Sequence, residues 1–446
     1  MKQLTPIDNS SLSASADFRS IRYLRWLIVL LVVFYCIQLV QAFSPLRIDG
    51  DAIDYLTAAA SAADGEKLAT LSKANMRPLG YPLMIATLDR IGMARPWSLV
   101  VLNCGWLLVG LLASYAIARK AYQLDERLAL VACLLTILSF SITKHTPLVA
   151  SDIPYFGLSL ASLAAFEHFG SMRGKVLQQI AWLLGGIFLL MAATLTRSIG
   201  VTLLPALGWS VLQIGWVRRR LSDRRFVVGG IAFVIVVIGV WWGRFAHSYY
   251  GGMFIQAYQG GLARSLGGIV LMRLRQLGEL TLNIPISRFS AVRSVSWIVG
   301  LIVVVGLFLG VYRRRRSLAT TDVYLLSYLG SMLLTPWGGG EGRYLIPVVS
   351  IAIVALIDEL RSLWARLGWA RIGVYAIATL YVSMGVVAMG YSTWITFSGP
   401  KFPERYGDGR LTATYRLFLL DQPPAAGEEL NPEGLKVLRR YGGRRK

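Results

Sequence analysis

LRWLIVLLVVFYCIQLVQA, residues 24–42, is a mostly apolar run, and FSPLRIDGDAIDY, residues 43–55, follows it directly. The first stretch is long enough to cross a hydrocarbon core of about 30 Å as a helix. The second stretch carries Asp51 and Asp54 just beyond the apolar run. Acids are scarce in this chain, which has 24 Asp and Glu against 46 Lys and Arg. An acidic cluster at the edge of a membrane therefore requires an explanation.

The composition of the chain is typical of a membrane protein. The chain is 55% hydrophobic and 16% charged, whereas about a quarter of the residues of a typical soluble domain are charged. Long apolar runs recur along most of its length. Because a backbone inside lipid must satisfy its own hydrogen bonds, such runs form helices. We therefore predict an all-α, polytopic membrane protein.

The apolar runs predict eleven transmembrane helices, from the first span to the last, which together form a transmembrane domain over residues 24–395. Residues 79–91 are also apolar, but the stretch is short for a span, and Pro82 and Asp89 interrupt it. The predicted spans cover residues 24–42, 97–118, 128–143, 148–168, 178–196, 199–216, 226–245, 294–312, 321–337, 344–360 and 372–395.

The basic clusters decide the topology. Cytoplasmic loops of membrane proteins carry an excess of Lys and Arg. If residues 79–91 do not cross, the basic clusters all fall on one side, whereas a crossing there would move most of them outside. We therefore expect a cytoplasmic N-terminus (1–23) leading into a retained signal anchor, a C-terminus outside, and a helix at 79–91 on the outer face. The clusters are residues 119–127, 173–175, 218–225, 313–316 and 361–371.

This topology gives the outer face two longer loops, short connections at 144–151 and 197–198, a glycine-rich turn at 338–343, and a tail. The first loop, residues 43–96, holds Asp51 and Asp54. The second, residues 246–293, has apolar residues at helical spacing with arginines among them, which is typical of an interfacial amphipathic helix. A short polar tail follows from residue 396 to residue 446. We expect a multi-pass protein of a bacterial inner membrane whose active site faces the periplasm or exterior, in contact with membrane lipids.

Several function classes are excluded. The net charge of +22 comes from short clusters between apolar runs, which is the membrane pattern rather than a nucleic-acid surface, so we expect no nucleic-acid partner. The three cysteines lie within apolar runs, and the three histidines lack metal-ligand spacing, so neither a divalent metal nor another cofactor is indicated. No phosphate-binding loop of the Walker type occurs, which argues against ATP-driven work.

Three acids on the predicted outer face could carry chemistry. Asp51 follows Gly50, where the chain can turn sharply, and Asp54 lies one helical turn further on. Asp152 stands at the mouth of the fourth span, in VASDIPY. The functional interpretation is a set of carboxylates that face one cavity. The alternative is that each acid only caps the start of a helix.

Three arginines also stand on the side that should have few basic residues: Arg77 in MRPLGYP, Arg197 in LTRSI, and Arg343, which precedes Tyr344. Arginine at a membrane edge often extends to lipid phosphate. Because these three oppose the charge bias of the topology, we interpret them as ligands for an anion such as a phosphodiester, a diphosphate or a lipid headgroup.

The order of these motifs resembles the GT-C membrane glycosyltransferases, which take sugars from polyprenyl phosphates; the protein O-mannosyltransferases and the lipid A aminoarabinose transferase are relatives of that kind. The resemblance covers roughly residues 20–360. Its motifs, in chain order, are GDAIDYL from Gly50, RPLGYP from Arg77, SDIP from Ser151, TR at Thr196 and GRYLIP from Gly342. The large outer domains of some relatives have no counterpart here.

The resemblance implies a catalytic role for Asp51, a second catalytic or positioning acid in Asp152, and donor-phosphate contacts by Arg77, Arg197, Arg343 and Tyr344. Accessory positions would be Asp54, Tyr55, Tyr81 and Glu341. A carboxylate would assist attack by an acceptor hydroxyl of a glycan, lipid or protein on a polyprenyl-phosphate-linked hexose or pentose. Because phosphate leaves readily, no general acid would be needed, and the anomeric centre would invert. The alternatives are a transporter or flippase of lipid-linked sugars, and a ligase or polymerase of lipid-linked glycans.

Overall fold

The computed structural model describes residues 10–66, 78–171, 176–213, 262–284, 293–334 and 342–443. Most of these residues are helical, and the only β-type pairing among them is an isolated bridge between Arg47 and Leu148. The α-helices are α1 (Ser10–Val40), α2 (Gly50–Ala63), α4 (Gly80–Arg90), α5 (Pro96–Lys120), α6 (Glu126–Ile137), α7 (Phe140–His145), α8 (Asp152–Ser171), α9 (Val176–Thr196), α10 (Leu204–Leu212), α14 (Leu262–Leu282), α15 (Arg293–Arg313), α16 (Thr320–Leu334), α17 (Ile346–Leu363), α18 (Arg371–Thr396), α19 (Phe402–Tyr406), α20 (Arg410–Leu420) and α21 (Pro432–Tyr441). Short 3₁₀ helices include η1 (Gln41–Phe43), η2 (Ser198–Leu203) and η5 (Arg343–Leu345).

The predicted membrane bundle is confirmed as an all-α architecture. Among the described residues, 5 helices are long and apolar enough to cross a membrane, at Tyr23–Phe43, Pro96–Lys120, Val176–Thr196, Ser294–Arg313 and Gly368–Thr396. Each coincides with a predicted span. Large apolar side chains on α1, α9, α15 and α18 are exposed, as expected for surfaces that face lipid. The total of eleven spans stays a prediction, and the span at 226–245 lies outside the described residues.

Helix α8 is the centre of the bundle. Nearly all of its side chains are buried, and it packs along both α5 and α9. Close approach depends on small residues, as is common between helices in membranes. A Cβ atom added to Gly157 would lie 2.5 Å from the backbone oxygen of Trp106 on α5. This packing fixes the position of Asp152, the first residue of α8.

Residues 128–143, predicted as a span, do not form one continuous helix, because the helix breaks between α6 and α7. The side chain of Asn283 stabilises the break. It accepts a hydrogen bond from the Phe140 amide at 2.6 Å and donates to the Leu138 and Tyr381 carbonyls, each at 2.9 Å. Unpaired backbone groups are costly inside a bundle, so one asparagine from beyond α14 makes an interrupted helix possible here.

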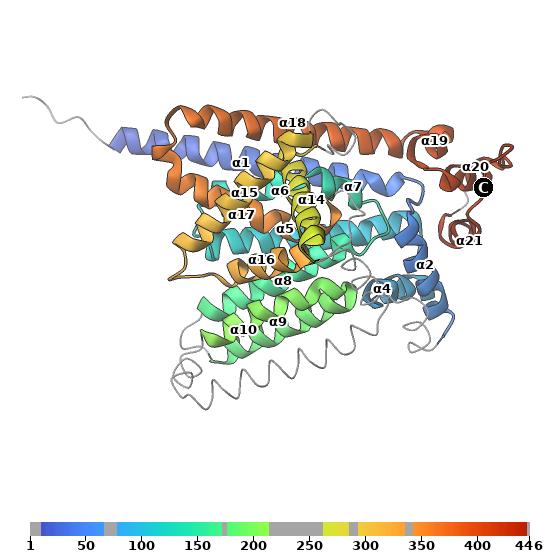
Figure 1. The fold of residues 1–446 in the computed structure, drawn as a ribbon, viewed down its shortest axis with the longest axis horizontal. Coiled ribbons are helices and arrows are strands. Elements are labelled where there is room, and N and C mark those ends of the chain that lie inside the picture. Colours follow the sequence, from blue (N-terminus) through green and yellow to red (C-terminus); the bar gives the residue numbers. More distant parts are fainter. Residues whose placement is uncertain are drawn as a thin grey trace, which may run out of the picture.

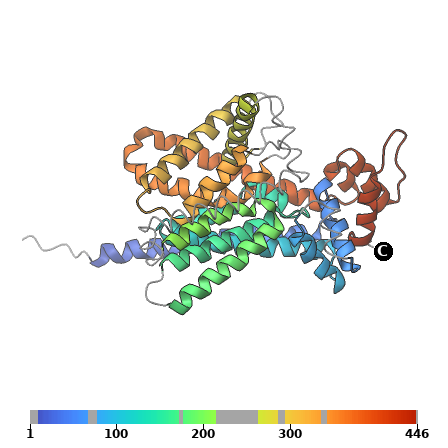
Figure 2. The same cartoon turned by 60° about the horizontal axis from the view of Figure 1, so that its bottom comes forward.

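Helices α2 and α4 gather with α19, α20 and α21 at one end of the bundle, which we call the α2 end (Figures 1 and 2). Residues 79–91 do form a short helix, α4. The segment after residue 396 is not an extended tail, because it folds into three helices. Their apolar side chains share a core with α2 and α4, which includes Ile53, Leu56, Phe402 and Leu438.

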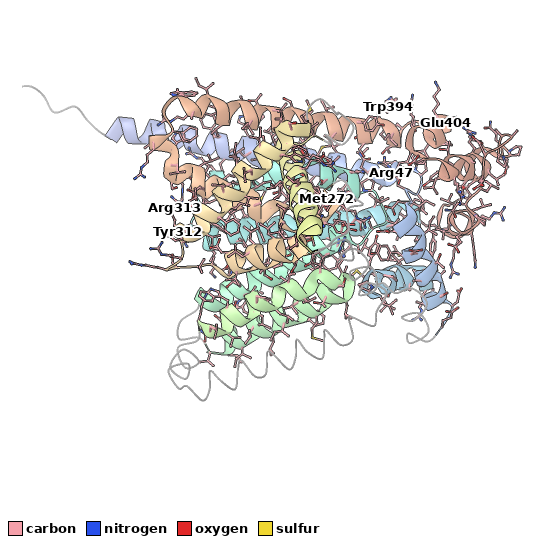
Figure 3. The ribbon with its side chains drawn as sticks, viewed as in Figure 1. Arg47, Met272, Tyr312, Arg313, Trp394 and Glu404 are labelled. Atoms are coloured by element: carbon pink, nitrogen blue, oxygen red, sulfur yellow. The ribbon has the colours of Figure 1, made fainter. Side chains whose placement is uncertain are left out.

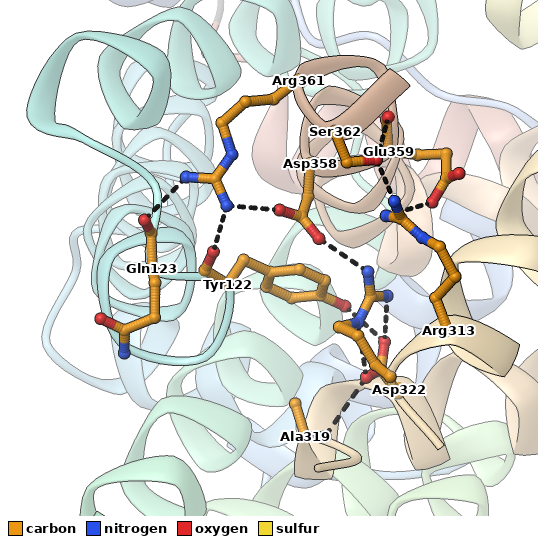
Figure 4. A network of polar contacts seen from close by, with 10 residues as sticks. Tyr122, Gln123, Arg313, Ala319, Asp322, Asp358, Glu359, Arg361 and Ser362 are labelled. Carbon is orange, nitrogen blue, oxygen red and sulfur yellow. Dashed lines mark hydrogen bonds and ion pairs between the residues drawn. The ribbon is translucent and has the colours of Figure 1, made fainter. Parts of the chain in front are cut away.

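The opposite end of the bundle carries a network of ion pairs between helix ends (Figure 4). Arg314 contacts Asp322 at 2.7 Å and Asp358 at 2.8 Å, while Arg361 contacts Asp358 at 2.7 Å. The Tyr122 hydroxyl donates to Asp322 at 3.0 Å. Figure 3 shows Arg313 of this end and Glu404 of the α2 end far apart along the long axis. The basic clusters that the structure describes, at 119–127, 313–316 and 361–371, therefore lie at the opposite end from the acidic α2 segment.

Candidate functional site

The acidic segment begins helix α2. Asp49 is its N-cap, and its carboxylate accepts a hydrogen bond from the Ala52 amide at 2.7 Å. Asp51 lies in the first turn. An acid at a helix N-terminus is favoured because it satisfies free amides and complements the helix dipole. The opposite face of α2, including Ile53 and Leu56, is buried against the end of the bundle. Asp49 and Asp51 are thereby held near the N-terminal end of α8, where Asp152 lies.

Arg343 joins three acids from distant parts of the chain. Its guanidinium lies 2.6 Å from the carboxylate of Asp51, 3.4 Å from that of Asp152 and 4.0 Å from that of Asp49. Asp152 also pairs with Arg197, which follows α9. These five residues, three acids and two arginines, are called the acid–arginine cluster below. Asp51 and Arg343 are 292 positions apart in the sequence.

Local backbone geometry presents Arg343 to this cluster. Gly342, which precedes it, has a φ of 67° in the left-handed region. Side chains other than that of glycine are unfavourable there. The chain turns at Gly342 and passes through η5 into α17. Gly342 therefore has a structural role in this turn. Residues 335–341, with Glu341, lie outside the described part of the chain.

The cluster is closed at one side and open at the other. The Asp152 side chain is 0% exposed, and those of Arg197 and Arg343 are 13% and 14% exposed. Asp51 and Asp49 are 29% and 37% exposed. The buried Asp152 thus anchors both arginines, while the α2 acids remain accessible to a substrate. A buried charge pair of this kind is stable only when well bonded.

Burial and the charges within the cluster shift the pKa values of Arg343 and Asp49. Burial alone would lower the pKa of Arg343, but the charges of Asp152, Asp51 and Asp49 outweigh it and raise that pKa above its ordinary value. Partial burial raises the pKa of Asp49, and the charges of Asp51 and Asp152 add to the rise against the opposing effects of the Ala52 amide and Arg343. Arg343 is therefore a permanent cation, and Asp49 holds its proton more tightly than an exposed aspartate.

Three arginines lie around the ring of Tyr344, the residue that follows Arg343. The guanidinium carbons of Arg197, Arg273 and Arg343 lie 5.7 Å, 5.8 Å and 5.8 Å from the centre of its ring. At such distances a cation is attracted to an aromatic face. Arg273, on α14, is buried and donates to the Met332 carbonyl. The site therefore has an acidic half at α2 and a basic half around Tyr344.

The remaining predicted residues differ in their placement. The Tyr55 hydroxyl lies 2.9 Å from that of Ser151, next to Asp152, and its ring packs edge-on against Tyr81. Both tyrosines are buried and support the first turn of α8 rather than the open side of the cluster. Asp54 is half-buried on α2. Arg77 lies outside the described residues.

Two residues of the site were not found from the sequence. Asp49 was overlooked, although an aspartate directly before glycine and a helical pattern is a common N-cap signal. Arg273 was assigned to an amphipathic helix on the membrane surface. The helix is present as α14, but it packs along α15 and contacts α16 and α18, which buries Arg273. A sequence pattern distinguishes an apolar face from a polar one but does not show what covers either.

A cavity of about 1090 Å³ also lies at the α2 end, but it is separate from the acid–arginine cluster. Its walls come from the ends of η1, α18, α20 and α21 and the start of α5, including Phe43, Trp97 and Phe397. None of the five cluster residues lines it. In the described ranges, no group of three or more His, Cys, Asp or Glu side chains could hold a metal ion.

The chain resembles solved structures in fold. It matches the archaeal oligosaccharyltransferase AglB from Archaeoglobus fulgidus, in complex with an inhibitory peptide and a dolichol-phosphate, with a TM-score of 0.50 and 12% identity over 94% of this chain. It matches ArnT from Cupriavidus metallidurans bound to undecaprenyl phosphate with a TM-score of 0.50 and 14% identity, also over 94% of this chain. It covers 64% of the AglB chain and 85% of the ArnT chain. No protein-family model and no curated protein sequence matches it.

At these identities the similarity concerns the fold alone. This chain therefore has a GT-C-like fold of membrane helices.

Proposed function

We propose that the protein is an integral membrane glycosyltransferase that moves a sugar from a polyprenyl-phosphate donor to an acceptor hydroxyl at the outer face of the membrane. The observation that carries this proposal is the acid–arginine cluster, in which a partly exposed carboxylate, Asp51, lies 2.6 Å from Arg343, whose side chain is 14% exposed. The fold adds support, because both matched structures contain a polyprenyl phosphate, a dolichol-phosphate in AglB and undecaprenyl phosphate in ArnT.

The two halves of the site correspond to the two requirements of the reaction. A sugar on a polyprenyl phosphate has a good leaving group, so the departing phosphate needs stabilisation by cations rather than a general acid. Arg197, Arg273 and Arg343 around Tyr344 are suited to that task. The Nε atom of Arg343 is buried and makes no hydrogen bond within the described residues, which leaves a donor for a phosphate oxygen.

The acidic half would activate the acceptor. In the proposed step the acceptor oxygen forms a bond to the anomeric carbon, the bond between that carbon and the phosphate oxygen breaks, and Asp51 takes the hydroxyl proton. Direct displacement of this kind inverts the anomeric centre. Asp152 is fully buried between Arg197 and Arg343, so we assign it the positioning of these arginines rather than contact with the acceptor.

Replacement of Asp51 tests the proposal. Asp51→Asn keeps the size of the side chain and removes the proton acceptor, so sugar transfer by the purified protein should fall by a factor of about 10² to 10⁴. Asp64→Asn is the matched control, because Asp64 is the C-cap of the same helix and pairs with Arg440 away from the cluster. Transfer from a polyprenyl-phosphate sugar would be measured in detergent or liposomes. A folded Asp51→Asn protein with the wild-type rate would refute the role of Asp51.

A further inference from the structure

We infer that the C-terminal helices position the acids of α2, through two tyrosine hydroxyls that hold the backbone of the segment immediately before them. The residues concerned are Tyr406 of α19 and Tyr415 of α20, and the segment is residues 46–48, called the pre-α2 segment below. The functional part of this inference rests on the proposed glycosyl transfer. The structural part, that these hydroxyls order the start of α2, can be tested separately.

Tyr415 bonds the pre-α2 segment in two places. Its hydroxyl donates to the Leu46 carbonyl at 2.7 Å and accepts from the Ile48 amide at 3.0 Å. The Tyr406 hydroxyl donates to the Ile48 carbonyl at 3.2 Å. These backbone groups precede α2, so the helix cannot satisfy them. Side chains from more than 350 residues further along the chain do so instead, and Tyr415 is fully buried.

The side chain of Arg47 holds the same segment to α18. Its guanidinium donates to the Ser392 carbonyl at 2.9 Å and to the Thr396 hydroxyl at 2.8 Å, and it is also bonded to Gln41. Arg47 is buried, and its guanidinium lies 5.7 Å from the centre of the Tyr406 ring. The pre-α2 segment is therefore bonded through its backbone by α19 and α20 and through its side chain by α18.

The position of the pre-α2 segment determines the positions of Asp49 and Asp51. Asp49 follows Ile48 directly and caps α2, and Asp51 is in the first turn of that helix. A shift at Ile48 would therefore move both acids relative to Arg343, which comes from elsewhere in the chain. Catalysis is sensitive to such shifts, because a displacement of about 1 Å can cost about 10²-fold in rate. Tyr406 and Tyr415 are thus positioning residues, which need not contact donor or acceptor.

The test is a pair of matched substitutions in the full-length protein. Tyr415→Phe removes the hydroxyl bonded to the pre-α2 segment and leaves the ring. Tyr441→Phe is the control, since Tyr441 is also buried in the C-terminal helices but donates to Asp89 on α4. Tyr415→Phe should lower kcat by about 10-fold to 100-fold, with the KM for the lipid donor within about twofold of wild type. Tyr441→Phe should retain kcat within about twofold.

Hydrogen–deuterium exchange supplies a second readout that does not depend on activity. Amides of residues 46–52 should exchange faster in Tyr415→Phe than in wild type, while those of α5 and α8 should not change. If Tyr415→Phe does not fold, Tyr406→Phe, which removes a single hydrogen bond, takes its place with a smaller effect in the same direction. Wild-type kcat and wild-type exchange in the variant, or an equal loss in Tyr441→Phe, would overturn the inference. Absence of transfer by the wild-type protein would refute the proposed function, and the exchange result would then decide the structural part alone.

Discussion

The three acids Asp49, Asp51 and Asp54 occupy different positions at the start of α2. Asp49 and Asp51 lie within ion-pair reach of Arg343, at 4.0 Å and 2.6 Å. Asp54 is one turn further along α2 and outside the acid–arginine cluster. The pattern of acids in the sequence suggested a pair formed by Asp51 and Asp54. The structure instead groups Asp51 with Asp49, because the helix starts at Gly50 and leaves Asp49 as its cap.

Loss of one partner from the buried pair of Asp152 and Arg197 should destabilise the protein. Asp152→Asn would leave Arg197, 13% exposed, without its carboxylate partner. Removal of one member of a buried pair costs about 3–5 kcal/mol, so we expect a clear fall in melting temperature in detergent. The measurement is thermal unfolding followed by intrinsic fluorescence.

The double variant Asp152→Asn with Arg197→Gln is the control for this prediction. It removes the charge that the single variant leaves unpaired, so it should be more stable than Asp152→Asn alone. If the single variant melts at the wild-type temperature, or if the double variant is the less stable of the two, the pair does not act as described.

Among the elements, the broken helix α6–α7 shows how a polar side chain shapes an apolar region. Residues 128–143 are apolar enough to predict one span, but the chain turns at Leu138 and Ser139. Asn283 bonds three backbone groups around the break. It also has a φ of 58°, a conformation that asparagine tolerates better than most residues.

Asn283→Ala should therefore destabilise the bundle. It would remove the side-chain partner of the Phe140 amide and the Leu138 carbonyl in a buried region, at a cost of about 2–3 kcal/mol or more. Tyr381→Phe is the comparison, because it removes one hydrogen bond, to the Leu135 carbonyl, and should cost about 1 kcal/mol. Melting temperatures in one detergent would be compared. Equal effects of the two substitutions would argue against a special role for Asn283.

At the scale of the whole molecule, the α2 end, which holds the acid–arginine cluster, and the ion-pair network around Arg314 lie at opposite ends of the bundle. Figure 3 shows Arg47, which precedes α2, and Arg313, which precedes Arg314, toward opposite ends. The network of Arg314, Asp322 and Asp358 joins the ends of α15, α16 and α17. Under the positive-inside rule that end belongs in the cytoplasm. The α2 end, with the folded C-terminal helices, would then face outward.

Cysteine labelling tests this orientation. In a Cys36→Ser background, the remaining cysteines, Cys104 and Cys133, are buried. A cysteine in place of Glu429, whose side chain is 66% exposed at the α2 end, should react with a membrane-impermeant maleimide on intact spheroplasts. A cysteine in place of Arg316, exposed at the opposite end, should react only after permeabilisation. The reverse pattern would place the acid–arginine cluster in the cytoplasm.

Much of the architecture can be predicted from residue order alone. The five confirmed spans are continuous apolar runs, and a backbone in lipid has few alternatives to a helix. Charge bias predicted that Asp51, Asp152, Arg197 and Arg343 would come to one face, and they do share one end of the bundle. These features depend on local composition, which a sequence displays directly.

The details of the site depend on contacts between distant segments. Pairing of Asp51 with Arg343, burial of Arg273 by α15 and α16, and the bonds from Tyr415 to Leu46 and Ile48 all join residues that are far apart in the chain. Propensity and periodicity say which face of a helix is apolar, but not which helix will cover it. The packing of α8 against α5 and α9, together with the folded C-terminal helices, sets the geometry of the acids and arginines.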